Sequence, residues 1–394
     1  MQAAYIVAAT RTPVGRRRGV FAHTRPDDLL AHALRELIHQ VPTLDPAQIG
    51  DVITGCAMPE AEQGMNVSRI ALLLAGLPQS VPGVTINRFC ASGLQAVAYA
   101  AQAIALGQAE VMIAAGVESM SVMPQITGNK TAPSPAIFAQ DEARAIAYGM
   151  GITAERVAAR WQISREDQDA FAYLSHRKAV AAIAAGKFKN EIAPYTVRSF
   201  EPDPSGQVRV TETVVHTDEG PRPDTTPEAL AKLKPAFDLK GSVTAGNSSQ
   251  MSDGAAAVLL MSEAAVKRCG VTPIARFAGY SVAGVAPEIM GIGPVAAIPR
   301  ALEQAGVALD AIDWIELNEA FAAQALAVMR ELQLDPNKVN PLGGAIALGH
   351  PLGATGAIRT ATLIHAMQRE GVRRGMVSMC IGTGMGAAGV FEGV

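Results

Sequence analysis

The order of apolar and polar positions in the first 120 residues predicts strands and helices in alternation. Apolar residues spaced as on one face of a helix lie between 29 and 41. An alanine-rich segment from 90 to 107 predicts a second, buried helix. Short apolar runs typical of buried strands stand at residues 5–9, 51–55, 84–89 and 111–115. Strands and helices joined by short connections are typical of a parallel sheet covered by helices.

The middle of the chain, from about 118 to 246, departs from this alternation. An amphipathic helix is expected to begin at Ser164, whose side chain can cap it, and to run to Gly186. Beyond it the sequence is irregular, with seven of the 24 prolines between Pro194 and Pro235. We interpret this region as an α-rich insertion that packs on the main body.

After Gly246 the alternating pattern resumes and repeats features of the first half. A Leu-Asp pair precedes an apolar strand in both places, at Leu44-Asp45 and at Leu309-Asp310. A helix containing Ala-Leu comes before each pair. The spacings differ by a few residues, so the repeat is weak. It nevertheless predicts two similar α/β halves with a site between them.

Composition narrows the class of protein. The 394 residues are 49% apolar and 18% charged with a net charge of −3, which excludes a disordered chain, a collagen and a coiled coil. Without a long basic run, nucleic-acid binding is not expected. The longest uncharged stretch, 89–109, contains Gln and Ser among its alanines, so we expect a buried helix and no membrane insertion. Four cysteines indicate a reducing compartment, and we expect a cytoplasmic enzyme.

Cys90 is the first candidate for chemistry. It stands where a predicted strand turns into a helix, and the free N–H groups and positive dipole end there favour thiolate over thiol. Small residues follow at Ala91, Ser92 and Gly93, which would let a substrate approach the backbone. The alternative is a buried structural cysteine, which is the interpretation we give to Cys56 and Cys269.

His350 is the second candidate. Five glycines and a proline surround it between 343 and 356, and histidine is the side chain best suited to take a proton near neutral pH. A phosphate-binding loop is a competing interpretation, but the Gly-Lys-Ser/Thr ending and G-x-G-x-x-G are absent. A purely structural histidine also remains open.

Two further segments end predicted strands. Cys380 is followed by alternating glycines from Gly382, whose exposed N–H groups could hold an oxyanion. Asn318 could donate a hydrogen bond, while Glu319 beside it could cap or brace the loop. No C-x-x-C, H-x-x-x-H or H-E-x-x-H spacing occurs, so we expect no metal site.

Taken together, these segments resemble the thiolase family, which cleaves or forms 3-ketoacyl-coenzyme A. The resemblance covers nearly the whole chain in the family's order. Further matching segments lie at residues 6–13, 116–120, 153–155 and 246–256. The family's fold implies α/β architecture with two duplicated halves, in which helices pack between and around two mixed five-stranded sheets, and an inserted α-rich loop domain. The expected boundaries are 1–118 with 247–270 for the N-terminal half, 119–246 for the loop domain, and 271–394 for the C-terminal half.

The resemblance also implies catalytic roles. Cys90 would carry the acyl group as a thioester, and His350 would take its proton. His350 and Asn318, the latter through a bound water, would form one oxyanion site. Cys380 would protonate the leaving enolate, and the N–H groups of Cys90 and Gly382 would form a second oxyanion site.

Contacts to coenzyme A follow from the same resemblance. The loop domain would bind coenzyme A, which is a substrate, and no cofactor is expected. Arg222 would lie against the adenine end and Ser249 against the pantetheine arm, while Phe321 and Met150 would line the pocket.

Two segments that bear on the substrate class differ from those of part of the family. Thiolases specialised for two acetyl units show His-Met-Gly where this chain has Gly149-Met150-Gly151, and Ser248-Ser249-Gln250 resembles the degradative branch. Both favour a 3-ketoacyl-CoA thiolase of fatty acid β-oxidation with broad chain length. Thr383 stands where many relatives have glycine, with little expected consequence.

Several alternatives stay open. They are an acetoacetyl-CoA thiolase, a ketoadipyl-CoA thiolase and a non-catalytic acyl-CoA-binding protein with the same scaffold. A decarboxylating condensing enzyme would use two histidines, and Cys380 argues against it. The family implies a homo-oligomer, either a dimer or a tetramer, and leaves open a hydratase/dehydrogenase partner.

Overall fold

The computed structural model describes residues 2–123, 132–202 and 205–394. The strands in these residues are β1 (Ala4–Arg11), β2 (Gly15–Arg16), β3 (Val52–Gly55), β4 (Gly83–Ile86), β5 (Val111–Ser119), β6 (Tyr195–Pro202), β7 (Val208–Val215), β8 (Ser252–Ser262), β9 (Ala275–Gly284), β10 (Trp314–Leu317), β11 (Arg374–Ile381) and β12 (Met385–Gly393). The α-helices are α1 (Pro26–His39), α2 (Val67–Leu74), α3 (Ser92–Ala105), α4 (Met150–Arg160), α5 (Arg165–Ala184), α6 (Pro227–Ala231), α7 (Glu263–Cys269), α8 (Gly293–Ala305), α9 (Ala322–Glu331), α10 (Ala345–Leu348) and α11 (Leu352–Glu370).

The strand pairing repeats between the two halves of the chain. In the first half β3 is parallel to β4 and β5, and β8 runs antiparallel to both β5 and β1. In the second half β10 is parallel to β11 and to a bridge at Val339, while β12 runs antiparallel to β11 and β9. The partners occur in the same order along the chain, which confirms the two similar halves. The residue boundaries given above for the three domains stay a prediction.

The two half-sheets are joined, which the sequence did not indicate. Within the described residues the main sheet has ten strands, nine of them in the order β10-β11-β12-β9-β1-β8-β5-β3-β4, with β2 beside β8. The link is short, because β1 and β9 pair only at Tyr5–Arg276 and Ile6–Ala275. Each of these strands would otherwise be the edge of its own half, with unpaired N–H and C=O groups, and mutual pairing satisfies some of them.

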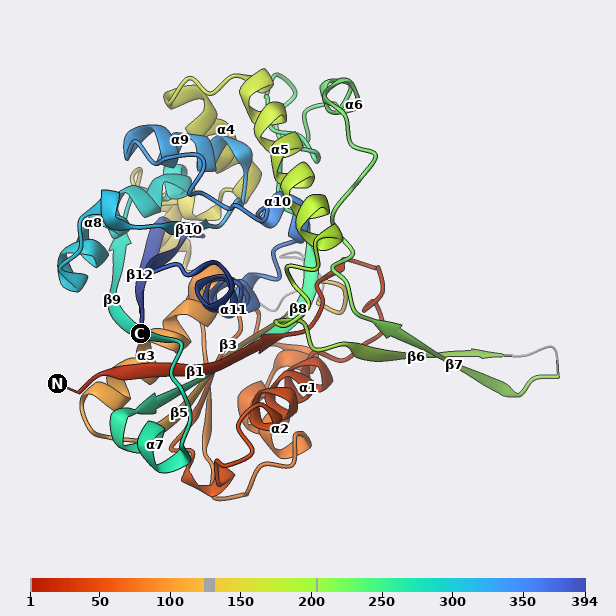
Figure 1. Ribbon diagram of the computed structural model, residues 1–394. Helices are drawn as coiled ribbons and strands as arrows, with labels where there is room; N and C mark the ends of the chain where they lie inside the picture. Colours follow the sequence, from red (N-terminus) through yellow and green to blue (C-terminus); the bar gives the residue numbers. More distant parts are fainter. Residues whose placement is uncertain (1, 124–131, 203–204) are drawn as a thin grey trace.

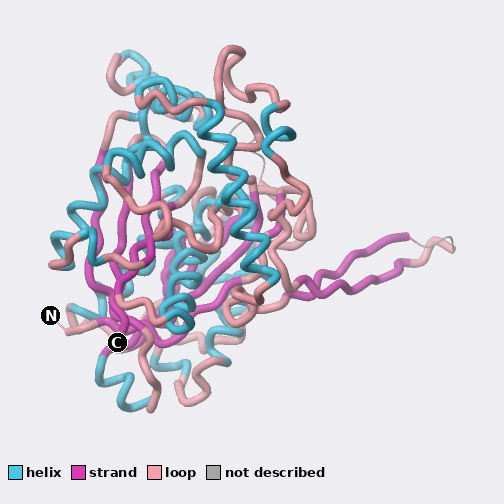
Figure 2. Tube along the Cα trace, turned by 45° about the horizontal axis from the view of Figure 1, so that its top comes forward, coloured by secondary structure: helices cyan, strands magenta, loops and turns pink. Residues whose placement is uncertain are grey.

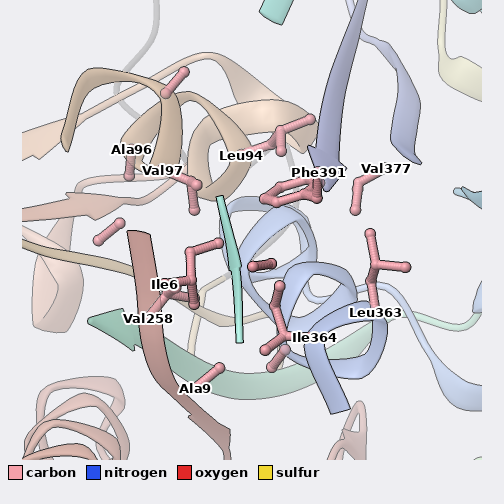
Figure 3. Packing of buried hydrophobic residues seen from close by; sticks show 14 of the residues in the cluster. Ile6, Ala9, Leu94, Ala96, Val97, Val258, Leu363, Ile364, Val377 and Phe391 are labelled. Carbon is pink, nitrogen blue, oxygen red and sulfur yellow. The ribbon is translucent and has the colours of Figure 1, made fainter. Parts of the chain in front are cut away.

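Helices form layers around and between the half-sheets (Figure 1). α1 and α2 pack outside the first half, and α8 and α9 outside the second. α3 and α11 form the central layer, where Leu94 and Leu363 meet Ile6 and Phe391 from the two half-sheets (Figure 3). The uncharged run 89–109 therefore lies in the core, as expected. Within the described residues, no helix is long and apolar enough to cross a membrane.

Small residues let α3 and α11 approach closely. A Cβ atom on Gly356 would lie 2.1 Å from the backbone nitrogen of Leu94, and one on Gly93 would lie 2.6 Å from that of Ala357. Both distances are shorter than any tolerated carbon contact, so only glycine fits at these positions. The two backbones therefore touch near the point where each helix begins.

The insertion between β5 and β8 contains α4, α5 and α6, and α5 has the predicted start. The Oγ of Ser164 accepts a hydrogen bond from the N–H of Asp167 at 3.0 Å. The insertion is attached to the main body through the buried Arg11, whose guanidinium pairs with Glu191 and Asp218, both at 2.7 Å. Residues 124–131 and 203–204 of the predicted loop domain lie outside the described residues.

The hairpin β6–β7 corrects the expectation of an irregular region (Figure 2). It projects from the body and leaves large apolar side chains in solvent, among them Phe200 and Val208. The strand signal was missed because prolines surround it and the exposed strands bury no continuous apolar face. The described part of the insertion thus contains this hairpin beside its α-helices, 3₁₀ segments and loops.

Candidate active site

Cys90 lies in a fixed turn between β4 and α3. The turn is a short 3₁₀ segment, Phe89–Ala91, and Phe89 has a φ of +46°, in the left-handed region that costs free energy for a residue with a side chain. The Oδ1 of Asn87 accepts a hydrogen bond from the N–H of Phe89 at 2.8 Å. The Oγ of Ser92 accepts one from the N–H of Arg88, also at 2.8 Å. These bonds hold the strained turn and place the thiol at the N-terminal end of α3.

Burial of Cys90 acts against the thiolate form that the helix terminus favours. Burial raises its pKa to about 11, although hydrogen bonds from the N–H groups of Gly382 and of Cys90 itself act in the opposite direction. Part of the residue reaches solvent, but protein atoms surround the sulfur. The loss of hydration raises the pKa of the thiol more than the helix terminus lowers it, so a base is expected to be needed to remove the proton of Cys90.

His350 lies between α10 and α11 and has two side-chain partners. Its Nε2 is 3.4 Å from the Nδ2 of Asn318, and its Nδ1 is 2.6 Å from the Oγ1 of Thr355. Burial lowers its pKa to about 3, and the positive charge of Arg359 adds to this effect. The imidazole is therefore neutral at rest and has one nitrogen lone pair available.

Asn318 follows β10 and is fully buried. Its N–H donates to the carbonyl of Ser378 at 2.8 Å, which ties it to the strand that contains Cys380. Among the described residues its Oδ1 has no hydrogen-bond partner. A buried amide oxygen without a protein partner is a place where a water or a substrate can donate a hydrogen bond.

Cys380 ends β11 close to Cys90 and is 1% exposed. Burial raises the pKa of its thiol well above the usual range, and the neighbouring charge of a Cys90 thiolate raises it further. Cys380 thus keeps its proton when Cys90 has lost one. A thiol in this state suits a proton donor rather than a second nucleophile.

Gly382 to Gly384 form the turn between β11 and β12. The N–H of Gly382 donates to the sulfur of Cys90, so it points into the site. Thr383 has a φ of +72°, which explains why glycine suits this position. Its hydroxyl donates to the carbonyl of Gly382 and not to a group that would compete for the N–H of that residue. The threonine therefore leaves the proposed oxyanion donor free.

An apolar cluster surrounds Cys380. It contains Phe321 and Met150, together with Ala154, Val243, Met290 and Ala320. The sulfur of Met150 would lie 3.5 Å from a Cβ atom on Gly382. Ser249 borders this cluster, because its N–H donates to the carbonyl of Ala320 at 2.9 Å. Six of the residues proposed from the sequence, namely Cys90, Cys380, Gly382, Met150, Phe321 and Ser249, are thereby brought together.

Arg222 is placed differently. Its side chain is exposed, and its N–H donates to the Nδ1 of His176 on α5 at 3.2 Å. The preceding segment is tied to the loop of His350, since the Nε2 of Gln250 donates to both Gly220 and Ala347. Arg222 therefore lies at the rim of the insertion and outside the catalytic cluster.

Comparison with known proteins supplies the family. The sequence model described as "Thiolase, N-terminal domain" matches residues 4–264, and that described as "Thiolase, C-terminal domain" matches residues 271–393. The chain belongs to the thiolase family. Within the part of this thiolase that the structure describes, no group of three or more His, Cys, Asp or Glu side chains is arranged to hold a metal ion.

Individual relatives of this thiolase cover its full length. A 3-ketoacyl-CoA thiolase of Bacillus subtilis (strain 168) is 52% identical over 393 residues, 100% of both chains. A beta-ketoadipyl-CoA thiolase of Pseudomonas aeruginosa is 48% identical over 99% of both chains. The crystal structure of the Bacillus anthracis acetyl-CoA acetyltransferase superposes with a TM-score of 0.90 at 42% identity, covering 100% of this chain and 99% of that one.

Two buried carboxylates brace the loops of the candidate site; the sequence indicated this role for Glu319, but not for Glu118, and it did not indicate their partners. Glu319 is buried, and its carboxylate accepts hydrogen bonds from Ser175, Asn340 and Ile346. Ser175, from α5, also accepts a bond from the N–H of Gly344 at 3.0 Å. Glu118 has a similar role on the other side and accepts from Ala57, Gln63 and Gly353. Glu319 and Glu118 stood in segments that the sequence singled out, but most of their hydrogen-bond partners did not. Those partners come close only through tertiary packing.

Substitution Glu319→Gln is expected to lower the free energy of unfolding by roughly 2 kcal/mol, since hydrogen bonds to a charged acceptor are lost and an amide N–H₂ faces other donors. The measurement is thermal or chemical denaturation, with kcat recorded beside it because the loops of Asn318 and His350 lose a support. Glu370→Gln is the control, at a partly exposed ion pair with Lys187. Equal stability losses in the two variants would contradict the bracing role.

Proposed function

We propose that this thiolase cleaves 3-ketoacyl-CoA with CoA, giving acetyl-CoA and an acyl-CoA shortened by an acetyl unit, through a thioester on Cys90. The observation that supports this most is the meeting of two chemically different thiols. Cys90 is reached by the N–H of Gly382, and Cys380 is held protonated beside it. A non-catalytic acyl-CoA-binding protein would not need both thiols together with a neutral histidine.

The first half of the reaction forms the thioester. The Nε2 of His350 takes the proton of Cys90, and the resulting thiolate attacks the C3 carbonyl carbon of the substrate. The oxyanion accepts hydrogen bonds from the protonated His350 and from the site of Asn318. The C2–C3 bond then breaks, its electron pair forms the enolate of acetyl-CoA, and Cys380 donates its proton to C2.

The second half transfers the acyl group. The Cys380 thiolate takes the proton of an incoming CoA thiol, and the CoA sulfur attacks the thioester carbonyl. The N–H groups of Cys90 and Gly382 stabilise the second oxyanion. When the thioester bond to Cys90 breaks, the leaving thiolate regains its proton from His350. Both cysteines and the histidine end in their resting states.

Substrate length is proposed to be broad. Cleaving both short and long chains requires room beside the reacting carbons, and a Cβ atom on Gly149 would meet no atom within 4 Å. Gly149 precedes Met150 of the apolar cluster, so no side chain fills the space beside Gly149, where a longer acyl chain could extend. Coenzyme A is proposed to lie along the insertion, with Ser249 at the pantetheine arm and Arg222 at the adenine end.

The test is a thiolysis profile from acetoacetyl-CoA to long-chain 3-ketoacyl-CoA, with 3-ketoadipyl-CoA as a separate arm. We expect kcat/KM to stay high beyond the four-carbon substrate. Activity confined to acetoacetyl-CoA would favour the acetyl-specific alternative, and preference for the dicarboxylate would favour the ketoadipyl one. Absence of thiolysis with every substrate would contradict the proposal as a whole.

We further propose a cytoplasmic homo-oligomer, a dimer or a tetramer, that acts in fatty acid β-oxidation. All four cysteines are free, which fits a reducing compartment. The edge strand β4 is partly exposed, with Val84 in solvent at 38%, and an uncovered edge suits contact with a second copy. Light scattering of the purified protein measures the oligomeric state.

A further inference from the structure

The contact between His350 and Thr355 is the shortest polar contact that either nitrogen of the imidazole makes. Thr355 lies in the first turn of α11, where its Oγ1 is 2.6 Å from the Nδ1 of His350. Both residues are buried, with 5% of His350 and 1% of Thr355 exposed. Protein atoms therefore surround this hydrogen bond.

The second nitrogen of the ring decides the direction of this bond. Nε2 faces the amide nitrogen of Asn318 at 3.4 Å, and an amide nitrogen only donates. With the amide nitrogen of Asn318 turned toward the ring, as it is in the structure, Nε2 acts as the acceptor, and the single proton of the neutral imidazole then lies on Nδ1. Nδ1 donates this proton to the hydroxyl oxygen of Thr355, which can accept because a hydroxyl has two lone pairs.

We propose that Thr355 is the positioning residue that holds the proton of neutral His350 on Nδ1, so that Nε2 keeps a lone pair that can exchange its long contact with the Asn318 amide for the proton of Cys90. The inference rests on the proposed function. In the step it supports, the S–H bond of Cys90 breaks, an N–H bond forms at Nε2, and the Nδ1–H to Thr355 stays in place throughout.

A hydroxyl in this position differs physically from a carboxylate. It orients the ring without adding a negative charge, so it gives the imidazolium little stabilisation. The charged group that faces His350 is Arg359, one turn later on α11, which pairs with Glu316 at 3.5 Å and disfavours a second positive charge. Glu118 faces Cys90 and disfavours its thiolate. The pair therefore rests as thiol and imidazole, and the proton moves only when a substrate carbonyl is present to receive the thiolate.

Three variants separate positioning from a structural role. Thr355→Val keeps the shape and removes the acceptor, whereas Thr355→Ser restores it. Thr360→Val is the matched control, because Thr360 is buried on the same helix and its Oγ1 bonds only the carbonyl of Gly356 at 2.7 Å. For each variant we would measure acylation of Cys90 by an acyl-CoA in a rapid-quench experiment with mass spectrometry, together with kcat and KM.

We expect Thr355→Val to slow acylation and kcat by roughly 10²-fold, the usual contribution of a positioned general base, with KM little changed. Its acylation rate should rise with pH, because thiolate must then form without the base, whereas that of the wild type should be flat near neutral pH. Thr355→Ser and Thr360→Val should both remain close to the wild type. Nitrogen NMR of histidine-labelled protein should show the proton of His350 on Nδ1.

Two results would overturn the inference. One is a resting His350 with its proton on Nε2, which would mean that the amide of Asn318 is oriented the other way. The other is equal loss in Thr355→Val and Thr355→Ser, which would indicate a packing role. Failure of the proposed function is distinguishable, since the wild-type enzyme would then form no acyl adduct on Cys90.

Discussion

Cys90→Ala is expected to lower the rate of thiolysis by roughly 10⁴-fold or more, because no other group can form the covalent intermediate. Cys380 lies beside it but keeps its proton, so it cannot replace the nucleophile. The measurement is steady-state thiolysis together with mass spectrometry of the intact protein after incubation with an acyl-CoA. The acyl adduct should disappear with the activity.

The control for this variant is Cys269→Ala. Cys269 is also a free, buried cysteine, but it ends α7 and packs in the cluster outside the first half-sheet. This variant should keep both activity and adduct. Turnover that survives in Cys90→Ala would contradict the proposed mechanism, and an adduct on another cysteine would assign the nucleophile elsewhere.

Cys380→Ser is expected to slow cleavage of the C2–C3 bond far more than it slows transfer of the acyl group between CoA and Cys90. Cleavage of the C2–C3 bond should fall by roughly 10²- to 10⁴-fold, the range for loss of a general acid, because a serine hydroxyl is a much weaker acid than a thiol. Acyl exchange between CoA and Cys90 forms no enolate and needs Cys380 only for the proton of the CoA thiol, so it should fall much less than cleavage. The measurement is isotope exchange between CoA and acyl-CoA beside the rate of 3-ketoacyl-CoA thiolysis.

This second variant distinguishes the roles of the two cysteines. Equal losses of exchange and cleavage would mean that Cys380 supports the geometry of Cys90 and donates no proton to carbon. Loss of exchange alone would reverse the proposed assignment. Circular dichroism and melting temperature show whether the buried serine disturbs the fold, because Cys380 lies in an apolar cluster.

Much of the fold could be predicted from local patterns. The buried strands, the helix that became α3 and the capped start of α5 all depend on residues close together in sequence. The weak repeat was also sufficient to predict two related halves, since each half preserves its own strand order. The hairpin β6–β7 was missed because its side chains are mostly exposed and show no buried face.

The residues of the candidate site could be predicted from the sequence, whereas their burial and hydrogen-bond partners could not. Glycine-rich segments at strand ends identified Cys90, His350 and Cys380. The effect of burial, which raises the pKa of the Cys90 thiol, could not be predicted, because a helix terminus can be recognised locally while burial depends on the whole fold. Ser175, the partner of Glu319, could not be predicted, since the two residues meet only through tertiary packing of α5. Thr355 follows His350 in the same glycine-rich segment, but its contact with Nδ1 depends on how α11 begins.

The close packing of α3 and α11 has a consequence for tolerance to change. Cys90, the proposed nucleophile, precedes α3, and His350, the proposed base, precedes α11, so the contact between these two helices helps to set how far apart the two segments lie. Gly93 and Gly356 define that separation by having no side chain. A side chain at either position is therefore expected to push the two segments apart and lower activity, although neither glycine is proposed to take part in a chemical step.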